Sequence, residues 1–332
     1  MRSFFTAFNL ALVSTLVPAC AADAQSSGPA VTSNMTTAGA PRSLSTFTSD
    51  AGGFDTHSFW LDTGREVVVF DAQFTEDLAK KLIAEIRAKT QSPIRWVVVT
   101  HPNPDKFNGA PAFQAIGAKV VASKSTANAI RGVHAYKKHY FVDVAKMFTE
   151  ETYPAQARLD VTFKGDFDLP LEGGTRVTLH ELGHRGVSST QTIAFIPQSR
   201  ALVVGDLVHH KAHAWLEGGI VDGKPAPDLA AWKQALDELL AYEGATVYGG
   251  RGEPAKVEEA VAAEKAYLDR MNGVVTSYVA ALGPAKSELS GARAGEHYKK
   301  IAARAEKEFP DYKLAYLVEY GVYGLVDQIA AK

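Results

Sequence analysis

The sequence predicts an α/β fold in which two β-sheets face each other and helices cover their outer faces. Apolar runs of strand length alternate with segments of helical periodicity in both halves of the chain. Each half begins with strand hairpins and continues with helices, which is the pattern of a layered α/β domain. The composition, with 46% hydrophobic and 22% charged residues, is that of an ordinary globular protein.

The elements of the first half follow one another without long gaps. Residues 58–73 predict a hairpin with its turn at Asp62-Thr63-Gly64, and residues 75–89 predict an amphipathic helix with Thr75 as N-cap. The apolar residues 94–100 predict a buried strand. The segments after it predict, in order, a helix at 110–117, a strand at 118–123 and a helix at 124–141.

The second half repeats the order of strands followed by helices. Strand-like runs cover residues 158–169, 175–183 and 190–208. Residues 229–244 predict a helix, and residues 245–250 predict a last strand. Beyond Glu253 the pattern is helical to the end of the chain, with a break near Gly283-Pro284.

The first 24 residues have the pattern of a secretory signal. Arg2 precedes an apolar stretch that is too short to span a bilayer, and small residues follow it. Two processing sites remain open. Ala22-Asp23-Ala24 suits signal peptidase, whereas Val17-Pro18-Ala19-Cys20 resembles a lipobox that would make Cys20 a lipid anchor. We therefore expect an exported protein, periplasmic or secreted, that contacts a membrane only through such an anchor.

The rest of the chain divides into three parts. Residues 25–53 are small and polar and predict a linker, residues 54–255 form the α/β domain, and residues 256–332 form a helical extension packed on it. Cys20 is the only cysteine, so the mature domain has neither a disulfide nor a thiolate ligand. The net charge of −2 and the absence of a basic run give no reason to expect a nucleic-acid partner.

Four turns that end predicted strands carry the polar residues of interest. They are His101–Asn108, Gly183–Ser189, Gly205–His213 and Gly249–Gly252. In a sandwich of two sheets such turns come together along one edge, which is a suitable place for a catalytic or metal site.

The four motifs, "THPNPDKFNGA", "LGHRG", "VVGDLV" and "YGGRGEP", resemble those of the metallo-β-lactamase superfamily and occur in the same order. The resemblance implies a four-layer αββα sandwich and a hydrolase whose strand-end turns hold two zinc ions. It matches His101, Asp105, His184 and Asp206 to residues of the metal site. It names no substrate, because the family acts on esters, lactams, lactones and thioesters.

This sequence departs from the family pattern at three positions of the metal site. Asn103, Lys106 and Arg251 stand where histidines are expected. An amide oxygen is a poor zinc ligand, and protonated ammonium and guanidinium groups have no lone pair to donate. We therefore expect at most one zinc or other divalent ion, held by His101, Asn103, His184 and Asp206. The two cations would then form a salt-bridged cluster with Asp105 and Asp206.

Other polar residues near these turns have simpler interpretations. Asp71 is interpreted as a structural aspartate that bonds nearby backbone. His209 or His210 is interpreted as a solvated or capping neighbour, and His213 as a candidate pocket residue.

Two functions follow from this sequence. The first is a hydrolase with a reduced metal site, in which Asp105 acts on a metal-bound water and Lys106 and Arg251 bind the substrate or its oxyanion. Its substrate would be an ester, lactone or amide-type small molecule. The second is a metal-free pseudoenzyme that binds a small anionic ligand or a protein partner. Activity as a two-zinc β-lactamase is not expected.

Overall fold

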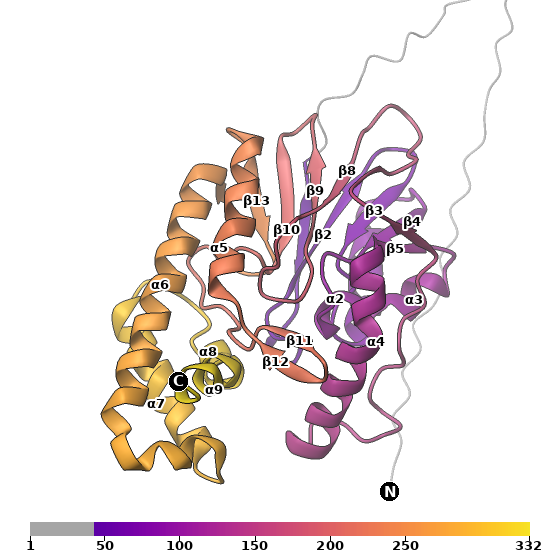
Figure 1. The fold of residues 1–332 in the computed structure, drawn as a ribbon. Helices are drawn as coiled ribbons and strands as arrows, with labels where there is room; N and C mark the ends of the chain where they lie inside the picture. The colour runs from indigo at the N-terminus through magenta and orange to yellow at the C-terminus, as the bar shows by residue number, and fades with distance from the viewer. Residues whose placement is uncertain (1–42) are drawn as a thin grey trace, which may run out of the picture. The chain divides into compact units, whose positions relative to one another are not determined.

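The computed structural model describes residues 43–332, so the signal segment, the lipobox and most of the expected linker lie outside the described residues. The described chain forms the expected sandwich (Figure 1), in which strands of two six-stranded sheets face each other. Among residues 43–332 we find no helix with the length and apolar character needed to cross a membrane.

The first sheet has the strand order β1-β2-β3-β4-β5-β6. Its strands are β1 (Ser45–Thr48), β2 (His57–Asp62), β3 (Val67–Phe70), β4 (Ile94–Val98), β5 (Lys119–Ser123) and β6 (Val161–Phe163). The hairpin of β2 and β3 is antiparallel, as expected, and β3 to β6 run parallel. One expectation was wrong here. Residues 45–48 were assigned to the linker, but they pair with β2 and begin the domain.

The second sheet has the order β14-β13-β10-β9-β8-β7. Its strands are β7 (Asp166–Asp168), β8 (Thr178–Glu181), β9 (Thr192–Ile196), β10 (Ala201–Gly205), β13 (Thr246–Gly249) and β14 (Ala255–Lys256). Strands β11 (Gly219–Val221) and β12 (Lys224–Ala226) form a separate hairpin.

Alternating side chains of the central strands divide the core into layers. In β3, Val68 and Phe70 belong to the apolar layer between the sheets, whereas Val67 and Val69 belong to the layer under the helices. Successive side chains of a strand point to opposite faces, so this four-residue apolar run predicts burial on both sides.

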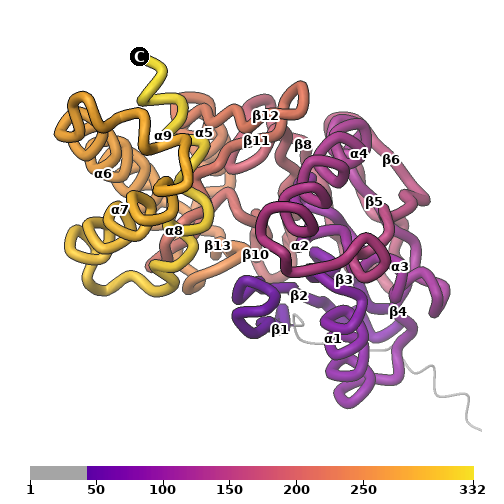
Figure 2. The backbone as a smooth tube through the Cα atoms, turned by 90° about the horizontal axis from the view of Figure 1, so that it is seen from below, coloured from indigo at the N-terminus to yellow at the C-terminus, as the bar shows by residue number. Residues whose placement is uncertain are grey.

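Helices cover the outer face of each sheet (Figures 1 and 2). On the first sheet these are α1 (Glu76–Lys89), α3 (Ala110–Gln114) and α4 (Lys124–His139). Thr75 caps α1 as expected, by accepting a 3.2 Å hydrogen bond from the backbone N–H of Leu78. The second sheet is covered by α5 (Leu229–Glu238) and α6 (Val257–Leu282).

The C-terminal extension is helical, with the expected break after Leu282. Its later helices are α7 (Ala294–Glu308), α8 (Tyr316–Gly321) and α9 (Tyr323–Ala330). Buried apolar residues of these helices share one core cluster with α5, α6 and the second sheet. The extension is therefore part of the folded domain.

Candidate functional site

Three of the four turns meet where β4, β10 and β13 end. His101 follows β4, Asp206 follows β10 and Arg251 follows β13, while Asp105 and Lys106 lie on the short helix α2 (Pro104–Phe107). Backbone hydrogen bonds join the turns. The N–H of Gly250 donates to the carbonyl of Gly205 over 2.7 Å, which fixes the ends of β10 and β13 against each other.

The side chains of these turns form a buried cluster of two cations and two carboxylates. Lys106 Nζ lies 2.8 Å from Asp206 Oδ1 and 2.9 Å from Asp105 Oδ2. Arg251 Nη1 lies 2.7 Å from Asp206 Oδ2, and Arg251 Nη2 lies 3.1 Å from Asp105 Oδ2. Each cation therefore bridges both carboxylates. We call these four residues the charge cluster.

Arg251 is further fixed by groups outside the charge cluster. Its Nε donates to the carbonyl of Phe54 over 2.7 Å, and its Nη2 donates to Thr56 Oγ1 over 2.8 Å. Thr56 Oγ1 also lies 2.9 Å from Asp105 Oδ2. A buried guanidinium that makes four hydrogen bonds is held in one orientation, and lysine could not reproduce its planar set of donors.

The pKa values of the cluster agree with permanent charges on all four groups. Burial alone would lower the pKa of Lys106, but Asp105 and Asp206 outweigh it and the pKa is raised. Burial alone would raise the pKa of Asp206, but Arg251 and Lys106 hold that pKa well below its usual range. Mutual pairing therefore keeps the cluster ionised in the absence of solvent.

His101 lies beside this cluster and is fully buried. Its Nε2 is 3.7 Å from Asp206 Oδ2 and has no hydrogen-bond partner, while its Nδ1 is 3.0 Å from Thr100 Oγ1. Asp71 behind it accepts hydrogen bonds from the backbone N–H and the hydroxyl of Thr100, each 2.9 Å long. Asp71 thus has the structural role that its sequence position indicates, and burial raises its pKa to about 6.

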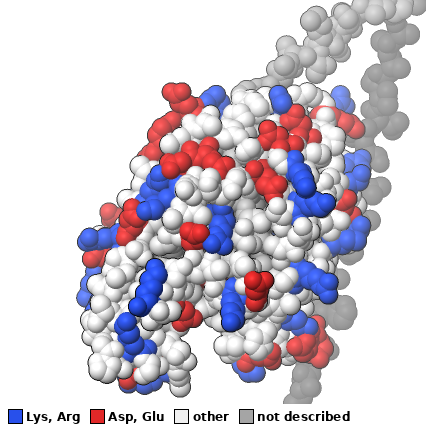
Figure 3. Space-filling model, viewed as in Figure 1, with Lys and Arg blue, Asp and Glu red and all other residues white. Residues whose placement is uncertain are grey.

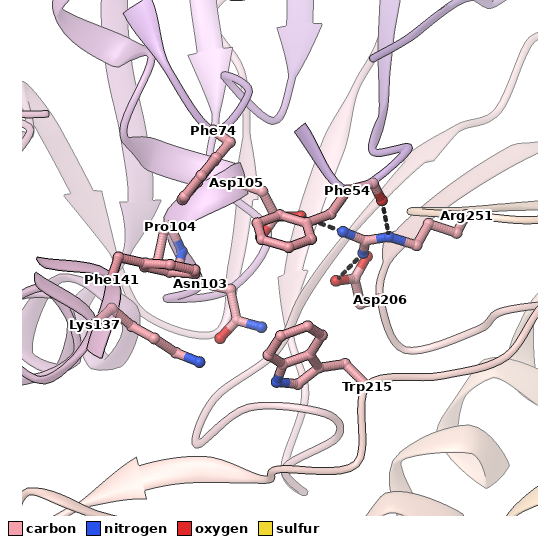
Figure 4. Close-up of a pocket in the computed structure, with 10 residues that line it drawn as sticks. All are labelled: Phe54, Phe74, Asn103, Pro104, Asp105, Lys137, Phe141, Asp206, Trp215 and Arg251. Atoms are coloured by element: carbon pink, nitrogen blue, oxygen red, sulfur yellow. Dashed lines mark hydrogen bonds and ion pairs between the residues drawn. The ribbon is translucent and has the colours of Figure 1, made fainter. Parts of the chain in front are cut away.

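A cleft opens at one side of the charge cluster (Figure 4). It encloses about 360 Å³, part of it open to solvent, and Asp105, Asp206 and Arg251 reach its wall. Its other lining residues are Phe54, Phe74, Asn103, Pro104, Lys137, Phe141 and Trp215. The cleft is therefore mainly aromatic, with charged groups at two places.

Lys137 and Trp215 bring a second buried charged group to the cleft. Lys137 Nζ is paired with Glu217, and the indole Nε1 of Trp215 donates to Glu217 Oε2 over 2.8 Å. The hydroxyl of Tyr323 in α9 also donates to Glu217. Lys137 Nζ lies 5.1 Å from the centre of the Trp215 ring, within the range of a cation–π contact.

His184, the fourth expected metal ligand, is not part of this arrangement. Its Nδ1 lies 2.8 Å from Glu238 Oε1 at the end of α5, and its side chain is 45% exposed. Glu238 also accepts hydrogen bonds of 3.0 Å from the backbone N–H groups of Gly183 and His184. The second turn is thus attached to α5, and His184 does not line the cleft.

A comparison with models of protein families shows which family this chain belongs to. The sequence model of the metallo-beta-lactamase superfamily matches residues 51–251. The chain belongs to this superfamily. It is therefore a hydrolase-like protein of the metallo-β-lactamase fold, as the four motifs predicted. No curated protein sequence matches the chain.

Solved structures of metallo-β-lactamases resemble it in fold. The enzyme from Pontibacter korlensis is 23% identical, with a TM-score of 0.52 over 68% of this chain and 94% of that chain. TMB-1 is 19% identical, with a TM-score of 0.47 over 68% of this chain and 97% of that one. FIM-1 from Pseudomonas aeruginosa, in its mono-zinc form, is 17% identical, with a TM-score of 0.48 over 67% and 90% of the two chains.

The residues of this family member do not fit a metal ion at the usual place. The superfamily generally binds zinc, but here the two acidic candidates already serve as acceptors for Lys106 and Arg251. In residues 43–332 no three histidine, cysteine, aspartate or glutamate side chains are grouped so that they could hold an ion. The side chain of Asn103 makes no capping hydrogen bond, but an amide oxygen is a weak donor to zinc. A divalent ion would also face two fixed positive charges.

The backbone leaves no spare room around the charge cluster. A Cβ at Gly250 would lie 1.9 Å from Asp206 Oδ1 and 3.0 Å from Lys106 Nζ. Gly250, the second glycine of "YGGRGEP", thus allows the turn after β13 to approach the paired side chains.

The three histidines that follow Asp206 lie in different surroundings from those expected from the sequence. His209 or His210 was expected to be a solvated or capping neighbour, but both side chains are buried. His213 lies between the rings of Tyr267, Phe309 and Tyr312 rather than among the residues lining the cleft. All three side chains are buried because the C-terminal extension covers this turn.

Sequence reasoning did not identify Thr56, Lys137, Trp215 or Glu217. Each lies outside the family motifs, and Lys137 joins the cleft from a helix that precedes the second sheet. The one signal in the sequence is "YKKHYF", in which aromatic residues surround Lys137 and Lys138. That pattern indicates aromatic packing around a lysine but does not say where the lysine points.

Proposed function

We propose that this protein is a metal-independent member of the superfamily that binds a small organic molecule in its aromatic cleft. The observation that carries the proposal is the position of Lys106 Nζ between Asp105 and Asp206, 2.9 and 2.8 Å from their oxygens. Lys106 and Arg251 together balance the charges of the two carboxylates, and a protonated ammonium group cannot itself be a metal ligand.

The cleft supports binding of a ligand with an apolar body. Ligand pockets of proteins usually combine apolar and aromatic walls with a few polar groups. The cleft of this protein has walls formed by Phe54, Phe74, Phe141 and Trp215. The polar groups stand at its margins, where they would orient a ligand.

A neutral fluorescent probe, N-phenyl-1-naphthylamine, tests this proposal. We expect saturable one-to-one binding to the mature protein, weakened about tenfold or more in Trp215→Leu, because stacking on the indole is lost. Trp60→Leu is the matched control, since Trp60 packs under the helices of the first sheet. Binding that is absent, or equally weakened in both variants, would refute the proposed cleft.

A hydrolase with one metal ion is the second candidate function. It is favoured by the buried Nε2 of His101, which has no hydrogen-bond partner and lies 3.7 Å from Asp206 Oδ2. The imidazole nitrogen could donate to zinc if Asp206 exchanged one of its cations for the ion. Tight uptake of one zinc ion that is lost in His101→Ala would favour this candidate over ligand binding alone.

We also propose that the protein is exported. The support is the charged, apolar and small-residue pattern of residues 1–24. Expression in a bacterial host and mass spectrometry of the processed protein test it. A soluble form beginning at Gln25 indicates a periplasmic or secreted protein, a lipid-modified Cys20 indicates a membrane-anchored one, and an unprocessed cytoplasmic chain contradicts export.

A further inference from the structure

The cleft has charged groups at two ends, the charge cluster at one and the Lys137–Glu217 pair at the other. The two ends differ in the ligand groups that they can still bind. At the charge cluster two cations face two carboxylates, so their charges balance. The hydrogen bonds and ion pairs of Asp105 described above all end on Oδ2, which leaves Oδ1 as an acceptor on a residue that lines the cleft. This end of the cleft therefore disfavours an anion.

The other end is arranged differently. Glu217 has three donors, Lys137 Nζ, Trp215 Nε1 and the Tyr323 hydroxyl, so its negative charge is shared among them. Lys137 has Glu217 as its one carboxylate partner, although an ammonium group carries three N–H donors. Its remaining donors are available beside the indole of Trp215.

Asn103 adds a neutral donor at the same end. Its side chain lines the cleft and makes no capping hydrogen bond, even though it precedes helix α2 at a capping position. Figure 4 shows the amide of Asn103, the amine of Lys137 and the indole of Trp215 directed toward a common part of the cleft. Two polar donors, on Asn103 and Lys137, and the aromatic ring of Trp215 therefore converge on one small region.

We propose that the cleft binds a flat aromatic carboxylate, whose carboxylate group accepts hydrogen bonds from Lys137 and Asn103. The aromatic ring then lies against Trp215 and Phe141, with its far edge toward Phe54 and Phe74. Asp105 Oδ1 repels a carboxylate at the opposite end, which gives the ligand one orientation. This assignment rests on the proposed function and adds to it the chemical class of the ligand.

The test compares 2-naphthoate with 2-naphthamide, which share a ring system and differ in charge. Isothermal titration of the mature protein should give 2-naphthoate an affinity about tenfold or more above that of 2-naphthamide, because charge-assisted hydrogen bonds are the stronger kind. Lys137→Met should abolish this difference, and Asn103→Leu should weaken naphthoate binding about threefold to tenfold.

Lys138→Met is the matched control, since Lys138 is the next residue of α4 and pairs with Glu150 at the surface. It should keep the preference for naphthoate. Because Lys137→Met leaves Glu217 buried without its cation, the double variant Lys137→Met/Glu217→Gln removes both charges and should also lose the preference. Thermal unfolding of each variant checks that it is folded.

The outcomes separate the ligand class from the cleft itself. The carboxylate assignment is overturned if 2-naphthoate and 2-naphthamide bind equally well. It is also overturned if the preference for 2-naphthoate survives in folded Lys137→Met or in the double variant. Binding of N-phenyl-1-naphthylamine without any binding of 2-naphthoate also overturns it but leaves the proposed function standing. Failure of all three compounds to bind refutes both.

Discussion

Lys106 Nζ and Asp206 Oδ1 are 2.8 Å apart although the two residues are separated by 100 positions in the sequence. With Arg251 and Asp105 they form a buried cluster at the edge where other members of the superfamily hold zinc. The cluster joins the turns after β4, β10 and β13, so it holds three distant parts of the chain together at this edge.

Removal of the lysine charge should therefore destabilise the protein strongly. Lys106→Met leaves two buried carboxylates with one cation, and loss of one partner of a buried ion pair costs about 3–5 kcal/mol. Urea denaturation at neutral pH measures the change in the free energy of unfolding. Lys138→Met, which removes the partly exposed lysine of the Lys138–Glu150 pair, should cost less than about 1 kcal/mol. A similar loss in both variants would show that the charge cluster does not hold the turns together.

The turn after β13 lies close against the charge cluster, so alanine at Gly250 should destabilise the protein. Alanine at Gly273, which has open space around it, should stabilise the protein. Gly250→Ala places a Cβ 1.9 Å from Asp206 Oδ1, so the cluster must shift, at a cost of about 1–3 kcal/mol. Gly273→Ala, in the middle of α6, has no atom within 4 Å of the new Cβ and should stabilise by about 0.5–1 kcal/mol. Thermal unfolding of both variants tests this pair, and an unchanged melting temperature in Gly250→Ala would contradict the structure of the turn.

His213 should make stability depend on pH. Burial lowers the pKa of His213 to about 4 from the ordinary value of 6.5. Above pH 6.5 the imidazole is neutral in both the folded and the unfolded chain. As the pH falls from about 6.5 to about 4, the unfolded chain takes up the proton first and stability decreases, by on the order of 2 kcal/mol in total.

A His213→Phe variant should lack this decrease, because phenylalanine does not titrate. The relevant quantity is the difference between variant and wild type at each pH. Asp71, whose pKa is raised to about 6, titrates in the same range in both proteins and cancels in that difference. His139→Phe, at an exposed pair with Asp143, is the control and should leave the pH profile close to that of the wild type. A constant difference between His213→Phe and wild type across this range would contradict the burial of His213.

Restoring histidines should restore zinc uptake. In the triple variant Asn103→His/Lys106→His/Arg251→His the two cations are replaced by imidazoles beside His101, Asp105 and Asp206, and imidazole and carboxylate groups are preferred zinc ligands. Elemental analysis after dialysis against zinc should show bound metal in the triple variant. Adding His101→Ala should reduce it. If the triple variant binds no more zinc than the wild type, the exchanged residues are not what excludes the ion.

The sequence was sufficient for the fold because its signals are local and agree with one another. The apolar run of β3, the capped amphipathic helix α1 and the break after Leu282 each depend on neighbours in the chain. The order of four strand-end motifs then identified the family. The start of the domain was missed because β1 is a four-residue strand in which half-buried and exposed residues alternate and none is fully buried.

The site could be predicted in part. The pairing of Lys106 and Arg251 with two carboxylates follows from charge and motif position. The direction of His184 could not be inferred, since it depends on Glu238, which lies 54 residues away on α5. The burial of His213 depends likewise on Tyr267 and Tyr312 from the extension. The position of Lys137 depends on Glu217, which lies 80 residues further along the chain.

We propose that Lys106 and Arg251 take the place of the metal in this protein. Titration of zinc into the chelator-treated mature protein at neutral pH, followed by calorimetry, tests it most directly. We predict no uptake of zinc at the charge cluster, and hence the same heat in the wild type and in His101→Ala. One ion bound per chain with micromolar affinity or better, and lost in His101→Ala, would contradict the account.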